Sequence, residues 1–263
     1  MNNSLKNKTV LLTRSENPFE FDTDLDGENG PRIILFPTIK IVEIENSPDV
    51  FKSLELLNSF DFILLTSVNA ADIFLKKISR SQITAGMIKV PVAVVGSKTR
   101  TFCEQNGLKV SFLPEKNFSA TGLIEELRKN NLSGKKILLP CSKLSAVELP
   151  EGLKSSGAKV EVIHTYDVVL PEKSDTAEAE ILLKKYAPHV YMFTSPSTFR
   201  NFAEILSISN VEEYFRDKIV AAIGKTTKKE IENHGVKVQI VPDIFTIRDM
   251  FKTAEEYFST HNL

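Results

Sequence analysis

An internal repeat constrains the fold of this chain more than any other feature of its sequence. When the sequence is shifted by 128 positions, the windows VAVVGSKTRTFCEQNGLKVSFLP and VAAIGKTTKKEIENHGVKVQIVP align without a gap. The same shift places Thr66-Ser67 on Thr194-Ser195. Self-similarity at a fixed period indicates repeated structural units. A chain of 263 residues is long enough for two small domains, so we interpret it as two copies of one unit.

Short apolar segments alternate with helical ones along the chain. TVLL, RIILF, FDFILL, VPVAVV and LKVSFL are rich in β-branched and apolar residues, as buried strands are. Helical patterns are interspersed with them at 50–60, 69–78, 98–107 and 119–130. Near-continuous apolar strands that alternate with helices indicate a parallel sheet covered on both faces. We therefore expect an α/β fold with two doubly wound parallel-sheet domains.

Two segments break this pattern, 39–45 (IKIVEIE) and 160–172 (VEVIHTYDVVLPE). Apolar and polar residues alternate along both, which is typical of half-exposed strands. We interpret them as connectors, with pairing between them as one option. In that case the middle of the chain forms one domain and the two ends together form the other. The sequence by itself also allows two consecutive domains.

Hydroxyl-bearing residues follow four of the predicted strands, each time where a helix begins. Ligands of open α/β sheets bind at the carboxyl ends of the strands, and a helix start offers free N–H groups to an anion. We expect Ser195 to be an N-cap with Pro196 at the first helical position, and Thr246 with Asp249 to form a weaker capping box. Capping alone accounts for any one of these residues. A carboxylate at one helix start gains only about 0.3–1 kcal/mol. The repeated pattern therefore suits a polycarboxylate held between two domains.

Composition and motifs exclude several classes of function. A net charge of −1 provides no basic field for nucleic acid or an anionic membrane. The N-terminus lacks the apolar core of a signal peptide, and no segment is long enough to span a membrane. The two cysteines and four histidines are not spaced as metal ligands, so we expect no metal site and a cytoplasmic location. IGKTTKK is not a P-loop, because Ile219 replaces the first glycine.

The sequence resembles the uroporphyrinogen-III synthases of tetrapyrrole biosynthesis along nearly its whole length. The resemblance rests on the order of LLTR, FDFILLTSVNA, VAVVGSKT, GLKVSFLPE, FSATGLIEEL, KILLP, GAKVEVIHTYDVVLP, FTSPS, AAIGKTT with GVKV, and TIRDM. It implies two α/β domains joined by a two-stranded linker, with the N-terminal strand completing the domain of the C-terminal half. The expected domains are 1–38 with 172–263, and 42–165, with linkers at 39–41 and 166–171.

The resemblance also implies a reaction. The family converts hydroxymethylbilane, a linear tetrapyrrole with eight carboxylates, into uroporphyrinogen III. Water is lost, the ring closes and ring D is inverted, with no metal or organic cofactor, so catalysis depends on positioning. The alternative is a two-domain protein that binds an anionic metabolite without chemistry. The expected partner is the small-molecule substrate, with no nucleic acid or membrane. The resemblance implies a monomer and leaves open a transient contact with hydroxymethylbilane synthase.

Tyr166 matches the tyrosine of the family, and the resemblance implies that its phenol helps the hydroxyl group of the substrate to leave, as a hydrogen-bond donor and weak acid. A purely structural tyrosine is the alternative. Three positions depart from the family pattern: Cys141 replaces a common Arg or Lys, with Lys143 as a substitute nearby, Ser142 replaces a glycine, and Arg100 replaces a small residue. The expected substrate-binding residues are Arg14, Thr66, Ser67, Thr99, Thr194, Ser195, Ser197 and Thr227.

Overall fold

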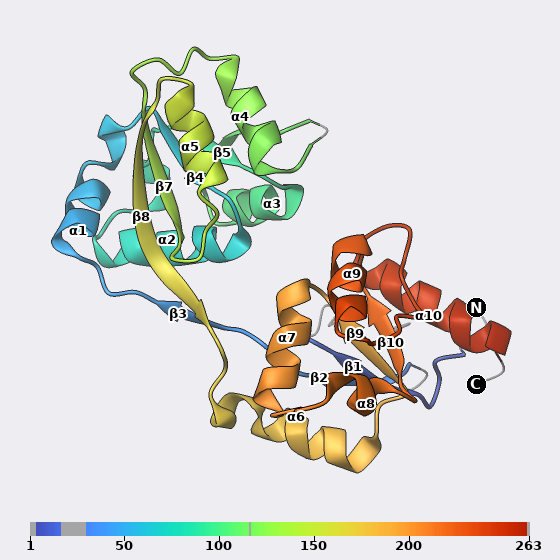
Figure 1. The fold of residues 1–263 in the computed structure, drawn as a ribbon. Helices are drawn as coiled ribbons and strands as arrows, with labels where there is room; N and C mark the ends of the chain where they lie inside the picture. Colours follow the sequence, from blue (N-terminus) through green and yellow to red (C-terminus); the bar gives the residue numbers. More distant parts are fainter. Residues whose placement is uncertain (1–3, 17–29, 116, 262–263) are drawn as a thin grey trace. The chain divides into compact units, whose positions relative to one another are not determined.

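The computed structural model describes residues 4–16, 30–115 and 117–261. The chain divides into two compact units, which are coloured along the sequence in Figure 1. The first, which we name the terminal unit, consists of Met1–Lys40 and Val169–Leu263. The second, the central unit, is the continuous stretch Ile41–Val168.

The central unit is built on a six-stranded sheet of order β3-β8-β7-β4-β5-β6, and the pairs from β8 to β6 are parallel. Residues of β4 alternate between two hydrophobic cores: Ile63 and Leu65 pack with Phe74, whereas Phe62 and Leu64 pack with Leu123. Both faces of the sheet are therefore covered. The strands are β3 (Lys40–Glu43), β4 (Phe62–Leu65), β5 (Val92–Val94), β6 (Val110–Phe112), β7 (Lys136–Ser142) and β8 (Lys159–Val169). The helices are α1 (Pro48–Glu55), α2 (Val68–Arg80), α3 (Ser97–Gln105), α4 (Ala120–Arg128) and α5 (Glu148–Ser155), with 3₁₀ turns at Leu57–Ser59 and Ala85–Met87.

The terminal unit has a parallel sheet of order β10-β9-β1-β2. Alternation again buries both faces: Leu11 and Phe193 lie in one core, and Leu12 and Met192 in the other. The predicted doubly wound α/β fold is confirmed. The strands are β1 (Thr9–Leu12), β2 (Arg32–Leu35), β9 (Val190–Phe193) and β10 (Ile219–Ala222). The helices are α6 (Lys173–Tyr186), α7 (Pro196–Ile205), α8 (Val211–Phe215), α9 (Lys225–Asn233) and α10 (Ile247–His261). None of the helices in the described ranges has the length and apolar character needed to cross a membrane.

The two copies of the repeat exchange their first strands. β1 begins the first copy, yet it pairs with β9 of the second copy. β7 begins the second copy, yet it pairs with β4 of the first. The copies also differ after the matched glycines Gly107 and Gly235. In the first copy the strand β6 follows, whereas the second copy has only a single bridge there, between Ala221 and Ile240. There the side chain of Gln239 accepts a hydrogen bond from the Val220 N–H at 2.8 Å, so a side chain takes the place of a backbone partner.

The two segments interpreted as connectors do pair with each other. β3 and β8 are neighbours in the central sheet, and the Ile44 N–H donates to the Thr165 carbonyl at 3.0 Å. β8 is more than a connector, however, because it pairs with β7 from Lys159 to Tyr166. Neither side of β8 is uniformly buried: Val160 and Val162 pack against one core of the central unit and Ile163 lies in the other, whereas Lys159, Glu161 and His164 are exposed.

A buried lysine fixes the chain after β3 to α2. The side chain of Lys77, only 2% exposed, donates to the Ile44 carbonyl and to Asn46 Oδ1, each at 2.6 Å. Its ammonium also lies 3.1 Å from a carboxylate oxygen of Glu43. A buried cation is tolerated only when it is paired and hydrogen-bonded, and these acceptors meet that need.

Candidate functional site

The residues predicted to bind the substrate lie at the carboxyl ends of parallel strands, in two groups. In the central unit, α2 begins after β4 and α3 after the neighbouring β5. In the terminal unit, α7 begins after β9 and α9 after the neighbouring β10. Adjacent parallel strands end at the same side of a sheet, so we name these regions the central edge and the terminal edge. The central edge holds Thr66, Ser67, Thr99 and Tyr166, and the terminal edge holds Arg14, Thr194, Ser195, Ser197 and Thr227.

Tyr166 reaches from β8 to the start of α2. Its hydroxyl lies 3.3 Å from the Oγ of Ser67, which is the N-cap residue of α2. The same Ser67 oxygen accepts a hydrogen bond from the Ala70 N–H at 3.1 Å, so the serine proton is available for donation to Tyr166. The Tyr166 side chain is buried and clusters with Ala70 and Ile73 of α2. Packing therefore fixes the Tyr166 ring, and its phenol oxygen lies beside the polar groups at the start of α2.

The hydroxyl groups at the start of α7 bond to one another. Ser195 caps the helix by accepting from the Thr198 N–H at 3.2 Å, and the Thr198 hydroxyl donates to the Ser195 carbonyl at 2.8 Å. The Oγ atoms of Ser195 and Ser197 are 2.9 Å apart. The predicted N-cap at Ser195, followed by Pro196 in the first turn, is confirmed. These hydroxyls have protein partners, so this helix start offers a ligand mainly its unpaired backbone N–H groups.

Thr194 is also tied to the protein, by a residue that the sequence analysis missed. The Thr194 hydroxyl donates to the Thr13 carbonyl, and the Thr194 N–H donates to Thr13 Oγ1, both at 3.3 Å. Thr13 follows β1, is buried, and donates its own hydroxyl to the Met192 carbonyl at 3.0 Å. Its place directly before Arg14 in LLTR was the available signal. Thr13 therefore fixes the carboxyl ends of β1 and β9 to each other.

Thr99 and Thr227 differ from the threonines of α7 because their hydroxyls have no partner. They occupy the third positions of α3 and α9, matched by the repeat, and are 5% and 3% exposed. Within the part of the chain that the structure describes, neither hydroxyl forms a hydrogen bond. Among the same residues, Thr38 alone has an unpartnered side-chain oxygen that is sealed from solvent. The Thr99 and Thr227 hydroxyls are therefore nearly buried, unpaired and still accessible.

The N-cap residues of α3 and α9 are glycines in extended conformation, Gly96 and Gly224. A Cβ at Gly224 would lie 3.2 Å from the ring of Phe245, closer than ordinary contact, so this ring would have to shift by a few tenths of an ångström. Phe245 is 56% exposed and directly precedes Thr246, whose hydroxyl accepts from the Asp249 N–H at 3.1 Å. Thr246 caps the start of α10, but the predicted capping box is incomplete, because the Asp249 carboxylate accepts from the Thr246 hydroxyl and the Thr246 N–H donates to the Ile244 carbonyl at 2.7 Å. The same segment adds an exposed aromatic ring to the terminal edge.

The remaining predicted residues have few contacts. Thr66 is half-buried between β4 and α2. Arg14 is exposed directly after β1, and its backbone N–H donates to the Leu12 carbonyl at 2.8 Å. Of the positions that depart from the family pattern, Cys141 is buried, and burial raises the pKa of its thiol. Lys143 forms an ion pair with Asp167 at 3.7 Å, and Arg100 forms one with Glu104 at 2.8 Å. No cluster of three or more side chains suited to a metal ion occurs among the described residues.

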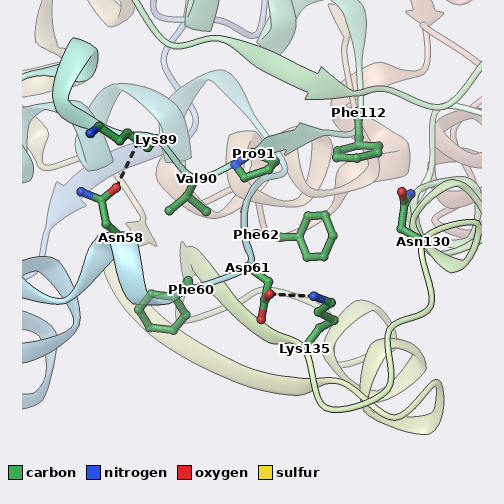
Figure 2. A pocket seen from close by; sticks show the side chains of 10 residues that line it. All are labelled: Asn58, Phe60, Asp61, Phe62, Lys89, Val90, Pro91, Phe112, Asn130 and Lys135. Carbon is green, nitrogen blue, oxygen red and sulfur yellow. Dashed lines mark hydrogen bonds and ion pairs between the residues drawn. The ribbon is translucent and has the colours of Figure 1, made fainter.

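A separate cavity of about 450 Å³ lies beside residues that precede the strands of the central unit, at the other end of these strands from the central edge (Figure 2). Asp61 and Pro91 directly precede β4 and β5, and Lys135 directly precedes β7. The Asp61 carboxylate accepts from the Lys136 N–H at 2.8 Å and from Lys135 at 2.9 Å, and these bonds lower its pKa. The Asp61 carboxylate is thus already paired, whereas Lys89 has no ion pair among the described residues, and none of the predicted site residues lines the cavity.

Comparison with known proteins identifies relatives across almost the whole chain. The family profile described as uroporphyrinogen-III synthase HemD matches residues 24–252. A putative uroporphyrinogen-III synthase from Methanothermobacter thermautotrophicus is 32% identical over 84% of this chain and 87% of its own length. The uroporphyrinogen-III synthase of Chlorobaculum parvum is 29% identical over 90% and 94%. A crystal structure of uroporphyrinogen-III synthetase from Helicobacter pylori shares the fold, with a TM-score of 0.64 at 16% identity over 95% of this chain and 99% of that one.

Proposed function

Because the chain belongs to the uroporphyrinogen-III synthase family, we propose that it forms uroporphyrinogen III with the side chains and helix starts of its central and terminal edges. The substrate in this proposal is the linear tetrapyrrole hydroxymethylbilane, and each unit acts as one of the two domains of the family. The protein works as a cytoplasmic monomer, and both of its cysteines are buried free thiols, as a reducing compartment favours.

The matched hydroxyls of Thr99 and Thr227 are the observation that carries this proposal. Buried polar groups in proteins nearly always have hydrogen-bond partners, and each exception calls for an explanation. Both hydroxyls lie in the first turn of a helix, where free N–H groups and the helix dipole favour an anion. A carboxylate of the substrate supplies the acceptor that each hydroxyl lacks. Two such positions in one chain suit a ligand that carries several carboxylates.

Tyr166 acts as the proton donor to the departing hydroxyl group of the substrate. When the Ser67 hydroxyl donates to the phenol oxygen, the phenol proton is free to point toward a ligand. Loss of water from the substrate then leaves a carbon electrophile, which ring D attacks before the macrocycle closes. The enzyme contributes mainly by holding the chain so that one carbon of ring D, and not the other, meets the electrophile. A preference of about 4 kcal/mol gives roughly a thousandfold selectivity.

An isomer analysis tests the proposal. Hydroxymethylbilane is generated in place, the purified protein is added, and the oxidised products are separated into uroporphyrins I and III. We expect mainly isomer III, because spontaneous closure gives isomer I. Isomer I alone, formed at the rate seen without protein, would mean that the chain binds but does not catalyse.

A further inference from the structure

The first turns of α3 and α9 carry charges that oppose the helix dipole. Lys98 is the second residue of α3, and Lys225 is the first residue of α9; neither first turn contains an acidic residue. The opposite ends of these helices carry glutamates, Glu104 in α3 and Glu232 in α9. The positive end of the helix dipole lies at the N-terminus, so cations there, like anions at the C-terminus, destabilise a helix.

The other helices of the chain do not share this arrangement. α6 begins with Lys173 but has Asp175 in its first turn, and α10 has Asp249 beside Arg248. α5 and α8 have acidic first turns. Among the helices that the described residues form, α3 and α9 alone combine basic residues with no acidic residue in the first turn. These two helices are also the pair matched by the repeat, at the central and the terminal edge.

Protein carboxylates do not neutralise these two lysines. Arg100 and Lys228, two and three residues further along, pair with glutamates of their own helices at 2.8 Å and 3.6 Å. Lys98 and Lys225 are exposed, and neither has an ion-pair partner in the described ranges. Each therefore leaves a full positive charge at a helix start that already attracts anions.

A second feature of the same two helix starts points to a ligand. Thr99 directly follows Lys98, and Thr227 lies two residues after Lys225. Both threonines are more than nine-tenths buried. Their hydroxyls have no partner among the described residues and are not fully sealed from solvent. The donors at each start are thus an ammonium, a hydroxyl and backbone N–H groups, and neither the ammonium nor this hydroxyl has a side-chain or backbone partner among the described residues.

We propose that Lys98 and Lys225 are carboxylate-binding residues, each contributing an ion pair to one carboxylate of a polycarboxylate ligand at its own edge. This inference rests on the proposed function and adds two residues to its binding site. It also explains the unfavourable position of the charges: the free protein is less stable because of them, and the bound ligand reverses their effect. A lysine kept only for solubility would have no reason to occur at these two starts.

The double variant Lys98→Gln with Lys225→Gln tests the proposal against the control Lys109→Gln with Lys237→Gln. The control lysines are matched by the repeat, exposed, lack ion pairs among the described residues and follow the opposite ends of α3 and α9. Both variants therefore remove the same charge from the same two units. KM for hydroxymethylbilane, kcat and the melting temperature without substrate are measured for each.

The test variant should raise KM about fivefold to tenfold, with kcat within twofold, and should raise the melting temperature by about 2 °C. The control should change KM less than twofold and should not raise the melting temperature. An unchanged KM in the test variant, an equal change in the control, or a lower melting temperature in the test variant would overturn the proposal. If the unmodified protein makes no isomer III, the proposed function fails instead, and the two failures are thereby distinguished.

Discussion

Three threonines lie at the same position of three helices, and replacing them by valine should lower the stability of the protein at one of them and weaken substrate binding at the other two. Thr99, Thr227 and Thr198 are the third residues of α3, α9 and α7, and all are buried. The Thr198 hydroxyl donates to the Ser195 carbonyl at 2.8 Å and accepts from the Ser195 N–H at 3.1 Å. The other two hydroxyls have no partner among the described residues. Valine has nearly the same shape as threonine, so the substitution changes only the polar group.

The structure sets the size and sign of each effect. Thr198→Val leaves two groups of Ser195 without their partner, which should lower the free energy of unfolding by about 1–3 kcal/mol. Thr99→Val and Thr227→Val break no hydrogen bond and remove a nearly buried polar atom. They should leave the free energy of unfolding unchanged or raise it by up to about 1 kcal/mol. If each hydroxyl donates to a substrate carboxylate, its loss should raise KM about tenfold to a hundredfold, since such a bond contributes about 1.5–3 kcal/mol.

Urea unfolding without substrate, followed by steady-state kinetics with hydroxymethylbilane, measures both effects. We expect Thr198→Val to lower the stability of the fold, whereas Thr99→Val and Thr227→Val should weaken substrate binding. A similar loss of stability in all three variants would show that the Thr99 and Thr227 hydroxyls have partners within the protein. An unchanged KM in the latter two would show that their hydroxyls do not contact the substrate.

Three further variants test other parts of the structure. Tyr166→Phe keeps the packing against Ala70 and Ile73 and should lower kcat severalfold with little change in product affinity; an unchanged kcat would remove the role of the phenol as proton donor. Lys77→Met leaves the Ile44 carbonyl and Asn46 without their donor and should lower the free energy of unfolding by about 2–3 kcal/mol. The control Lys76→Met, at the exposed neighbouring residue, should change it by less than about 0.5 kcal/mol. Equal effects would contradict the stabilising role of the buried Lys77. His189 accepts from the Thr9 N–H at 2.9 Å, and partial desolvation of this surface residue, with the charge of Lys8, lowers its pKa below the usual 6.5. The unfolded chain therefore binds more protons than the folded one as the pH falls through 6.5, so stability decreases there. His189→Gln keeps an acceptor and should flatten this dependence in urea unfolding at pH 5 to 8; a parallel curve would assign it to other groups.

The sequence was sufficient to predict the elements that follow from periodicity. The shift of 128 positions matches β4 with β9, and it relates α3 to α9 residue by residue. Hydrophobic runs and caps are local properties, which explains why the N-caps at Ser67 and Ser195 and the cap at Thr246 were predictable. The exchange of β1 and β7 between the copies cannot be predicted from local sequence, because a short apolar strand fits equally well in either of the two sheets. That choice entered only through the resemblance to a family.

The candidate site was predictable as a set of positions but not as a set of contacts. Thr99 and Thr198 are both threonines in the first turn of a helix, and only the second has protein partners. Both bonds of the Thr198 hydroxyl go to backbone groups of the N-cap residue Ser195, and the N-cap Gly96 of α3 has the same groups, so the difference depends on local geometry that the residue types do not specify. Thr13 and Phe245 were missed for a similar reason, since their contacts join segments that lie far apart in the sequence or depend on a loop conformation.

The exchanged first strand has a consequence for synthesis on the ribosome. Val10 pairs with Val190, so β1 has no partner from the second copy until some 180 further residues have been made, as the spacing of Thr9 and His189 shows. At about 5–20 residues per second this takes roughly 10–40 s, during which the continuous central unit can already fold. β1 and β2 alone form only a two-stranded pair, which is too small to be stable. Throughout this interval the apolar segment Thr9–Leu12 lacks the strand that covers it in the folded protein, and an unpaired apolar strand is prone to pair with other chains.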